Sequence, residues 1–211
     1  MTGPPGQAPG GTGEAPLLNI ANMLTLLRLL LVPVFVALLF VDGGHQPTWR
    51  IASGVVFGLA ALTDRIDGDI ARRRGLVTRF GMIADPIADK ALIGAALIGL
   101  NLLGDLPWWI TVVIGVRELG VTALRFWVLR YGVIAASRGG KLKTLVQTVT
   151  IALYVLPIAG LLPDGTVDHG RWWLMLLAVL ITVVTGLDYV QRALRMRAGG
   201  LGEASTVGRA G

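Results

Sequence analysis

The chain repeatedly runs through apolar stretches that approach the roughly 20 residues needed to cross the hydrocarbon core of a bilayer. Hydrophobic residues make up 54% of its 211 residues and charged residues only 15%. That balance is far more apolar than a soluble domain of this size shows. It predicts an all-α integral membrane protein with one compact bundle of helices, because the length leaves no room for a second folded domain.

Clusters of Gly, Pro and charged residues divide the apolar sequence into six segments, each predicted to be a transmembrane helix. The segments cover residues 23–41, 50–73, 79–103, 107–131, 142–163 and 171–193. The Gly- and Pro-rich residues 1–15 are predicted to form a disordered tail. Residues 198–211 have the same loose, polar character and are expected to be a flexible tail, which leaves 16–197 as the membrane domain.

Lys and Arg gather in the connections on one side of this predicted bundle and in the C-terminal tail. The basic residues of that side are Arg65, Arg72, Arg73, Arg74, Arg79, Arg130, Arg138, Lys141, Lys143, Arg192, Arg195, Arg197 and Arg209. The opposite loops hold only Arg50 and Arg171, beside several aspartates. By the positive-inside rule, both termini are expected on the cytoplasmic side of the cell membrane. The net charge of +6 forms no basic stripe, so nucleic acid is not an expected partner.

Ionisable residues within the predicted spans lie almost entirely in the cytoplasmic halves. Each such charge costs roughly 2.5–3.5 kcal/mol at the centre of a bilayer, so it needs a partner or water. The outer half is therefore predicted to be dry and the inner half to hold a polar cavity that faces the cytoplasm. A channel or pump carries polar groups through its full thickness, so this asymmetry favours an enzyme. A divalent-cation transporter is the alternative from another class, and it would need acidic residues that continue into the outer halves.

Four aspartates form the most informative cluster. Asp64 and Asp67 are three residues apart, which places both on one face of a helix. Asp85 and Asp89 are four apart on the next helix, across a short basic turn, so the two pairs are expected to converge. Four carboxylates would repel one another unless cations neutralised them. Oxygen ligands suit Mg²⁺ or Mn²⁺, and two such ions can clamp the attacking and leaving oxygens of a phosphoryl transfer. Ordinary interfacial salt bridges to the neighbouring arginines are the simpler alternative.

This segment resembles the signature of the CDP-alcohol phosphatidyltransferase family, D-x2-D-G-x2-A-R-x8-G-x3-D-x3-D. All eight specified positions are filled without a spacing error, by Asp64, Asp67, Gly68, Ala71, Arg72, Gly81, Asp85 and Asp89. The six predicted spans are also similar to the family fold, so the resemblance extends over about residues 19–193.

The resemblance implies a metal-dependent membrane transferase that moves the phosphatidyl group of CDP-diacylglycerol onto an alcohol. It implies that the four aspartates hold two Mg²⁺ or Mn²⁺ ions and that Asp89 is also the general base. The residues that it implies for CDP-diacylglycerol binding are Asn22, Thr25, Gly68, Arg72 and Thr78. A homodimer is implied as well.

The signature leaves the acceptor alcohol open. A phosphorylated acceptor needs a basic pocket, for which Arg117, Lys141 and Lys143 are the candidates. Alternatively, the two lysines only anchor their helix at the membrane surface, and Arg117 only pairs with Glu118. The segments NMLTLLRLLLVPVF, DPIADK, RELGVTALR and GGKLKTLVQ look like the branch of the family that uses glycerol 3-phosphate. Glycerol 3-phosphate is therefore the predicted acceptor, with an inositol phosphate and phosphatidylglycerol as alternatives.

Overall fold

The computed structural model describes residues 20–74, 79–128, 138–158 and 165–207; within these ranges, side chains are not described at 21, 64–74, 79–83, 125, 126, 128, 138, 139, 141 and 196–207. All the regular structure in the described part of the chain is helical. Its elements are α1 (Ile20–Phe40), η1 (Val41–Gly44), α2 (Pro47–Arg74), α3 (Arg79–Leu102), α4 (Trp108–Val128), α5 (Arg138–Val155) and α6 (Thr166–Val207).

Each predicted span coincides with one of the six α-helices, so the all-helical prediction is confirmed. Two predicted ends are displaced. The fifth helix ends at Val155 and not near 163, because Pro157 offers no N–H and disfavours the helical conformation of the residue before it. The last helix continues to Val207, past the predicted end at 193 and into residues assigned to the tail. Two stretches, Asn22–Gly44 and Thr166–Arg195, are long and apolar enough to cross a membrane.

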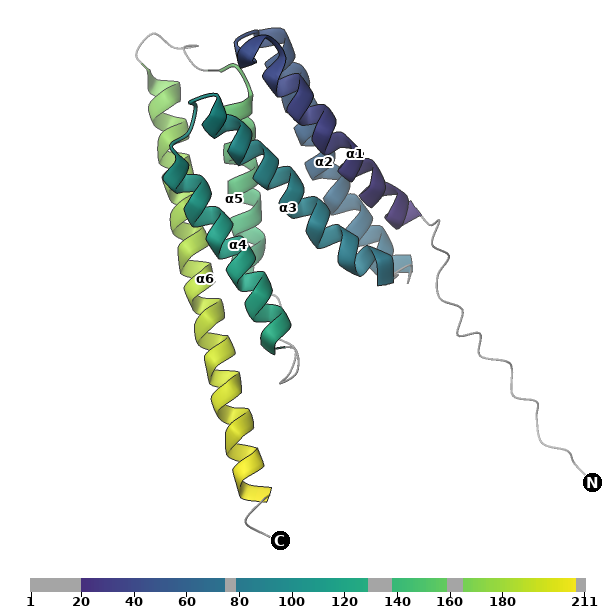
Figure 1. Ribbon diagram of the computed structural model, residues 1–211, viewed down its shortest axis with the longest axis vertical. Helices are drawn as coiled ribbons and strands as arrows, with labels where there is room; N and C mark the ends of the chain where they lie inside the picture. Colours follow the sequence, from purple (N-terminus) through teal and green to yellow (C-terminus); the bar gives the residue numbers. More distant parts are fainter. Residues whose placement is uncertain (1–19, 75–78, 129–137, 159–164, 208–211) are drawn as a thin grey trace, which may run out of the picture.

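The helices lie alongside one another and alternate in direction (Figure 1). The first residues of α1 and α3 and the last residues of α6 lie toward one end of the bundle, which we call the signature end. The η1 turn and residues 103–107 lie at the other end, which we call the distal end. Helix α1 packs against α2 and α3, whereas α6 packs against α4 and α5. Helices α1 and α3 therefore run side by side in the same direction.

An apolar core fills the middle and the distal part of the bundle. Its centre includes Phe35 of α1 and Phe57 of α2, whose ring centroids are 5.6 Å apart. Asn22, Thr25, Arg28 and Lys143 are buried nearer the signature end, whereas Ser53 and Asn101 are buried nearer the distal end. Polar side chains are thus buried toward both ends, and the expected contrast between a dry half and a polar half of the bundle stays a prediction.

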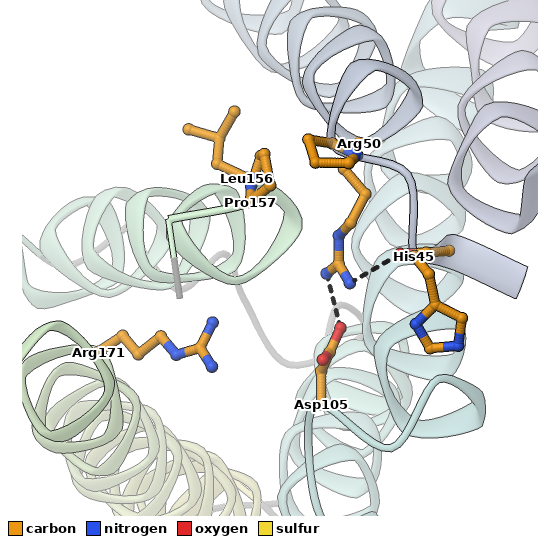
Figure 2. A pocket seen from close by; sticks show the side chains of 8 residues that line it. His45, Arg50, Asp105, Leu156, Pro157 and Arg171 are labelled. Atoms are coloured by element: carbon orange, nitrogen blue, oxygen red, sulfur yellow. Dashed lines mark hydrogen bonds and ion pairs between the residues drawn. The ribbon is translucent and has the colours of Figure 1, made fainter. Parts of the chain in front are cut away.

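Arg50, in the first turn of α2, connects this helix to α5, to η1 and to the turn before α4 at the distal end. Its guanidinium lies 2.6 Å from the carboxylate of Asp105 and donates to the carbonyl oxygens of Tyr154, Val155 and Gly44. Figure 2 shows Arg50 and Asp105 on one side of a cavity of about 260 Å³, with the Arg171 side chain on the other. The sequence placed Arg50 in an outer loop, but the guanidinium is largely enclosed and links α2 to α5, η1 and the turn before α4.

Replacing Arg50 with glutamine should destabilise the distal end, because Asp105 and three carbonyl oxygens lose a charged donor. Removing one partner of a buried ion pair costs about 3 kcal/mol. We expect a clear fall in the unfolding temperature of the detergent-purified protein. The double variant R50Q/D105N should recover part of that loss, since it leaves no uncompensated carboxylate. An unchanged unfolding temperature would contradict this role of Arg50.

Candidate active site

Asp85 and Asp89 lie one turn apart on α3 and both contact α1. The hydroxyl of Thr25 donates to Oδ1 of Asp85 at 2.5 Å. The guanidinium of Arg28 approaches Oδ1 of Asp89, with a separation of 3.5 Å from Nη1. Thr25 and Arg28 are buried, whereas the Asp89 side chain is 49% exposed. The two carboxylates are thus held from the α1 side, and that of Asp89 is also open to its surroundings.

The two contacts follow from the parallel course of α1 and α3. A step of three residues along α1 rises about 4.5 Å, and a step of four along α3 rises about 6 Å. Thr25 can therefore face Asp85 while Arg28 faces Asp89. The spacing within the signature places both aspartates on one face of α3, and a matching three-residue spacing on α1 supplies their partners.

Six of the predicted site residues lie outside the described side chains. These residues are Asp64, Asp67, Gly68, Arg72, Thr78 and Lys141. Within the described residues there is no group of three or more His, Cys, Asp and Glu that could hold a metal ion, and two of the four predicted ligands lie beyond them. The donors that are described, Asp85 and Asp89, offer carboxylate oxygens one helical turn apart. That chemistry fits Mg²⁺ or Mn²⁺, which prefer oxygen ligands.

Asn22 and Thr25, the predicted contacts to the nucleotide on the first helix, are both buried. Thr25 is engaged with Asp85. A polar α1 residue beside the predicted metal ligands is well placed to meet the diphosphate end of a nucleotide, and whether it does so stays a prediction.

The predicted acceptor residues Arg117 and Lys143 meet at Glu118. Nζ of the buried Lys143 on α5 forms an ion pair with the Glu118 carboxylate on α4. Nη1 of Arg117 lies 3.1 Å from the same carboxylate. The expected alternative of an Arg117–Glu118 pair is therefore present, but it is part of a three-residue cluster that joins two helices.

Arg117 also reaches across to α6. Its Nε donates to the carbonyl oxygen of Thr182 at 3.2 Å, and its Nη2 donates to the hydroxyl of Thr185 at 3.0 Å. A Cβ at Gly186 would lie 3.0 Å from Cγ of Arg117, so the absence of a side chain there lets the arginine pass close to α6. These contacts fix the guanidinium on three sides.

Lys90 follows Asp89 directly on α3, and its charge has only a weak effect on Glu118 and Lys143. We call Lys90, Arg117, Glu118 and Lys143 the basic cluster. Three cations and one carboxylate give it a surplus of positive charge next to the Asp89 turn, which is the electrostatic environment that a phosphate group requires.

A comparison with protein families matches residues 18–184 to the model described as CDP-alcohol phosphatidyltransferase. The chain belongs to this family. The resemblance stated from the aspartate signature is thereby confirmed, and the match covers most of the chain.

Curated members of the CDP-alcohol phosphatidyltransferase family are similar to this chain along most of their length. A Mycobacterium tuberculosis H37Rv protein named probable phosphatidylglycerophosphate synthase is 57% identical over 183 residues, or 87% of this chain and 85% of its own. A Bacillus subtilis protein named CDP-diacylglycerol–glycerol-3-phosphate 3-phosphatidyltransferase is 36% identical over 189 residues, 83% of this chain and 95% of its own. The Escherichia coli K12 protein of that name is 34% identical over 181 residues, 83% and 94%.

Arg28, Lys90 and Glu118 lie beside predicted site residues but were not predicted as site residues from the sequence. Glu118 was considered only as a partner of Arg117. The signal for Arg28 was its three-residue distance from Thr25, which repeats the periodicity of a helix face. Nothing in the sequence indicates that Lys143 meets Glu118, because the two lie on different helices.

Proposed function

We propose that this chain transfers the phosphatidyl group of CDP-diacylglycerol to glycerol 3-phosphate, which gives phosphatidylglycerophosphate and CMP in phospholipid biosynthesis. The observation that carries the proposal is the complete aspartate signature, with Asp85 and Asp89 on one face of α3 next to a basic cluster. The names of the relatives support the choice of donor and acceptor.

Two divalent ions bound by Asp64, Asp67, Asp85 and Asp89 would neutralise the diphosphate and the charge that develops on the departing CMP. Asp89 is the proposed general base, which accepts the proton of the acceptor hydroxyl. The hydroxyl oxygen then bonds to the phosphatidyl phosphorus, and the bond from that phosphorus to the CMP oxygen breaks. The exposure of the Asp89 carboxylate supports this role, because a base must be reachable by the acceptor.

The donor nucleotide is proposed to bind between α1 and the signature segment. Asn22 and Thr25 of α1 would contact it together with Gly68, Arg72 and Thr78 of the signature segment. The contact between Thr25 and Asp85 supports this placement, because it puts α1 next to a proposed metal ligand.

The phosphate of the acceptor is proposed to bind at Arg117, Lys141 and Lys143. The surplus positive charge of the basic cluster supports this site. A phosphate held there would bring an attached hydroxyl toward the proposed base.

We further propose that all six α-helices cross the cell membrane. Both termini and the polar cavity at the signature end would then face the cytoplasm. The enzyme is also proposed to be a homodimer. Large apolar side chains exposed along the helices, such as Leu30, Leu59, Val112 and Leu180, support contact with lipid. A divalent-cation transporter is disfavoured. Of the described distal acids, Asp105 and Asp168 are paired with Arg50 and Arg171, and Asp42 is exposed in η1.

The direct test is CMP release by the purified chain from CDP-diacylglycerol and Mg²⁺ with each acceptor in turn. Glycerol 3-phosphate should support a rate at least about tenfold above inositol 1-phosphate or phosphatidylglycerol, because a misplacement of the reacting hydroxyl by about 1 Å can cost about 10²-fold in rate. Thorough chelation of divalent ions should stop the reaction. Preference for another acceptor would overturn the substrate, whereas metal flux into liposomes without lipid nucleotide would revive the transporter.

A further inference from the structure

Arg28 is an unusual residue for its position. It lies on the apolar helix α1, and its side chain is completely buried, with 0% exposure. A charged side chain inside a membrane bundle requires a compensating charge. Among the carboxylates that the structure describes, the one it approaches is that of Asp89.

The geometry of this contact differs from that of a tight salt bridge. The 3.5 Å separation between Nη1 of Arg28 and Oδ1 of Asp89 is longer than a charge-assisted hydrogen bond of about 2.7–2.9 Å. By contrast, Arg50 lies 2.6 Å from Asp105 at the distal end. Arg28 therefore acts on Asp89 mainly through its charge, from the buried side, while the carboxylate keeps an exposed side.

We propose that Arg28 is a positioning residue that serves as a built-in cation for the aspartate site. It holds the Asp89 carboxylate toward α1 and offsets part of the negative charge of the four aspartates before any metal ion binds. The inference rests on the proposed function for the presence of a metal at these aspartates, but the residue and the direction of its effect come from the α1–α3 contact.

A built-in cation has a consequence that a purely structural arginine lacks. Arg28 stabilises the metal-free site, because its positive charge reduces repulsion between the carboxylates. It stabilises the metal-loaded site less, because the ions already neutralise the aspartates and repel a nearby guanidinium. Loss of Arg28 should thus lower the stability of the metal-free protein more than that of the metal-loaded protein, and by linkage should tighten metal binding.

The test compares unfolding temperatures of the full-length chain in detergent, in EDTA and across a Mn²⁺ titration. In EDTA, the unfolding temperature of Arg28→Gln should be lower than that of the wild type. Addition of Mn²⁺ should raise the unfolding temperature of the variant by more than it raises that of the wild type. The midpoint Mn²⁺ concentration should drop about threefold or more. CMP release at saturating Mn²⁺ should fall about tenfold, because Asp89 is less well held. Arg28→Lys keeps the charge and should show a wild-type rise and a wild-type midpoint with Mn²⁺; a larger rise or a lower midpoint would contradict the role of the charge, whether or not Arg28→Gln folds.

Arg50→Gln is the matched control, since it removes a largely buried, ion-paired arginine at the far end of the same bundle. Its unfolding temperature should fall by the same amount in EDTA and in Mn²⁺. An Arg28→Gln variant that behaves in this way would overturn the proposed role and leave Arg28 as a structural residue. A wild-type protein that gains no stability from Mn²⁺ would instead overturn the metal site of the proposed function, and the role of Arg28 with it.

Discussion

Replacing Asp89 with asparagine should reduce CMP release by about 10³-fold or more. The amide has nearly the same shape as the carboxylate but accepts no proton at neutral pH, and loss of a general base costs about 10²–10⁴-fold. An amide is also a weaker partner for a divalent ion than a carboxylate, because it lacks the negative charge. Both losses act on the same step, so the rate with saturating substrates should show them together.

The control for this variant must separate chemistry from folding, because Asp89 also faces Arg28. Elution as a single species in detergent and a cooperative thermal transition would show that Asp89→Asn is folded. Asp188→Asn is a matched substitution on α6, where the carboxylate is exposed and pairs with Arg192 one turn away. It should keep nearly full activity, since a surface pair of this kind contributes little. Near-normal turnover by Asp89→Asn would remove Asp89 from the role of base.

The helices and one face of the site could be predicted from local sequence, because both depend on spacing along a single segment. Apolar length and punctuation by Gly and Pro predict where each helix lies. The four-residue step from Asp85 to Asp89 predicts a shared face on α3, and the structure places both next to α1. The end of α5 was mispredicted because the apolar character of the sequence continues past Pro157, although the helix does not.

Contacts between helices could not be predicted in the same way. The Lys143–Glu118 pair depends on how α4 and α5 are rotated about their own axes, which no local pattern encodes. Arg50 shows the same limit, since the sequence assigned it only to an outer loop and its neighbours on α5 come from a hundred residues further along. Charges near the ends of spans thus indicate where polar partners are needed, but only the packing of the bundle decides which partners they find.

Replacing Lys143 with methionine should raise the KM for glycerol 3-phosphate by about 10–100-fold, which corresponds to the loss of one hydrogen bond to a charged group. Methionine keeps the length and most of the volume of lysine, so the buried side chain leaves no large gap on α5. The KM for CDP-diacylglycerol should change little, because none of the proposed nucleotide contacts lies on α5. The measurement is CMP release with each substrate varied in turn while the other is saturating.

The variant also leaves the Glu118 carboxylate with Arg117 alone, and this could disturb the cluster without any contact to substrate. The double variant K143M/E118Q separates the two causes, because it removes the Glu118 charge along with the lysine. If Lys143 binds the acceptor phosphate, the high KM should persist in the double variant although its unfolding temperature recovers. If the KM returns to the wild-type value with the stability, then Lys143 serves only to neutralise Glu118, and the acceptor phosphate must bind elsewhere.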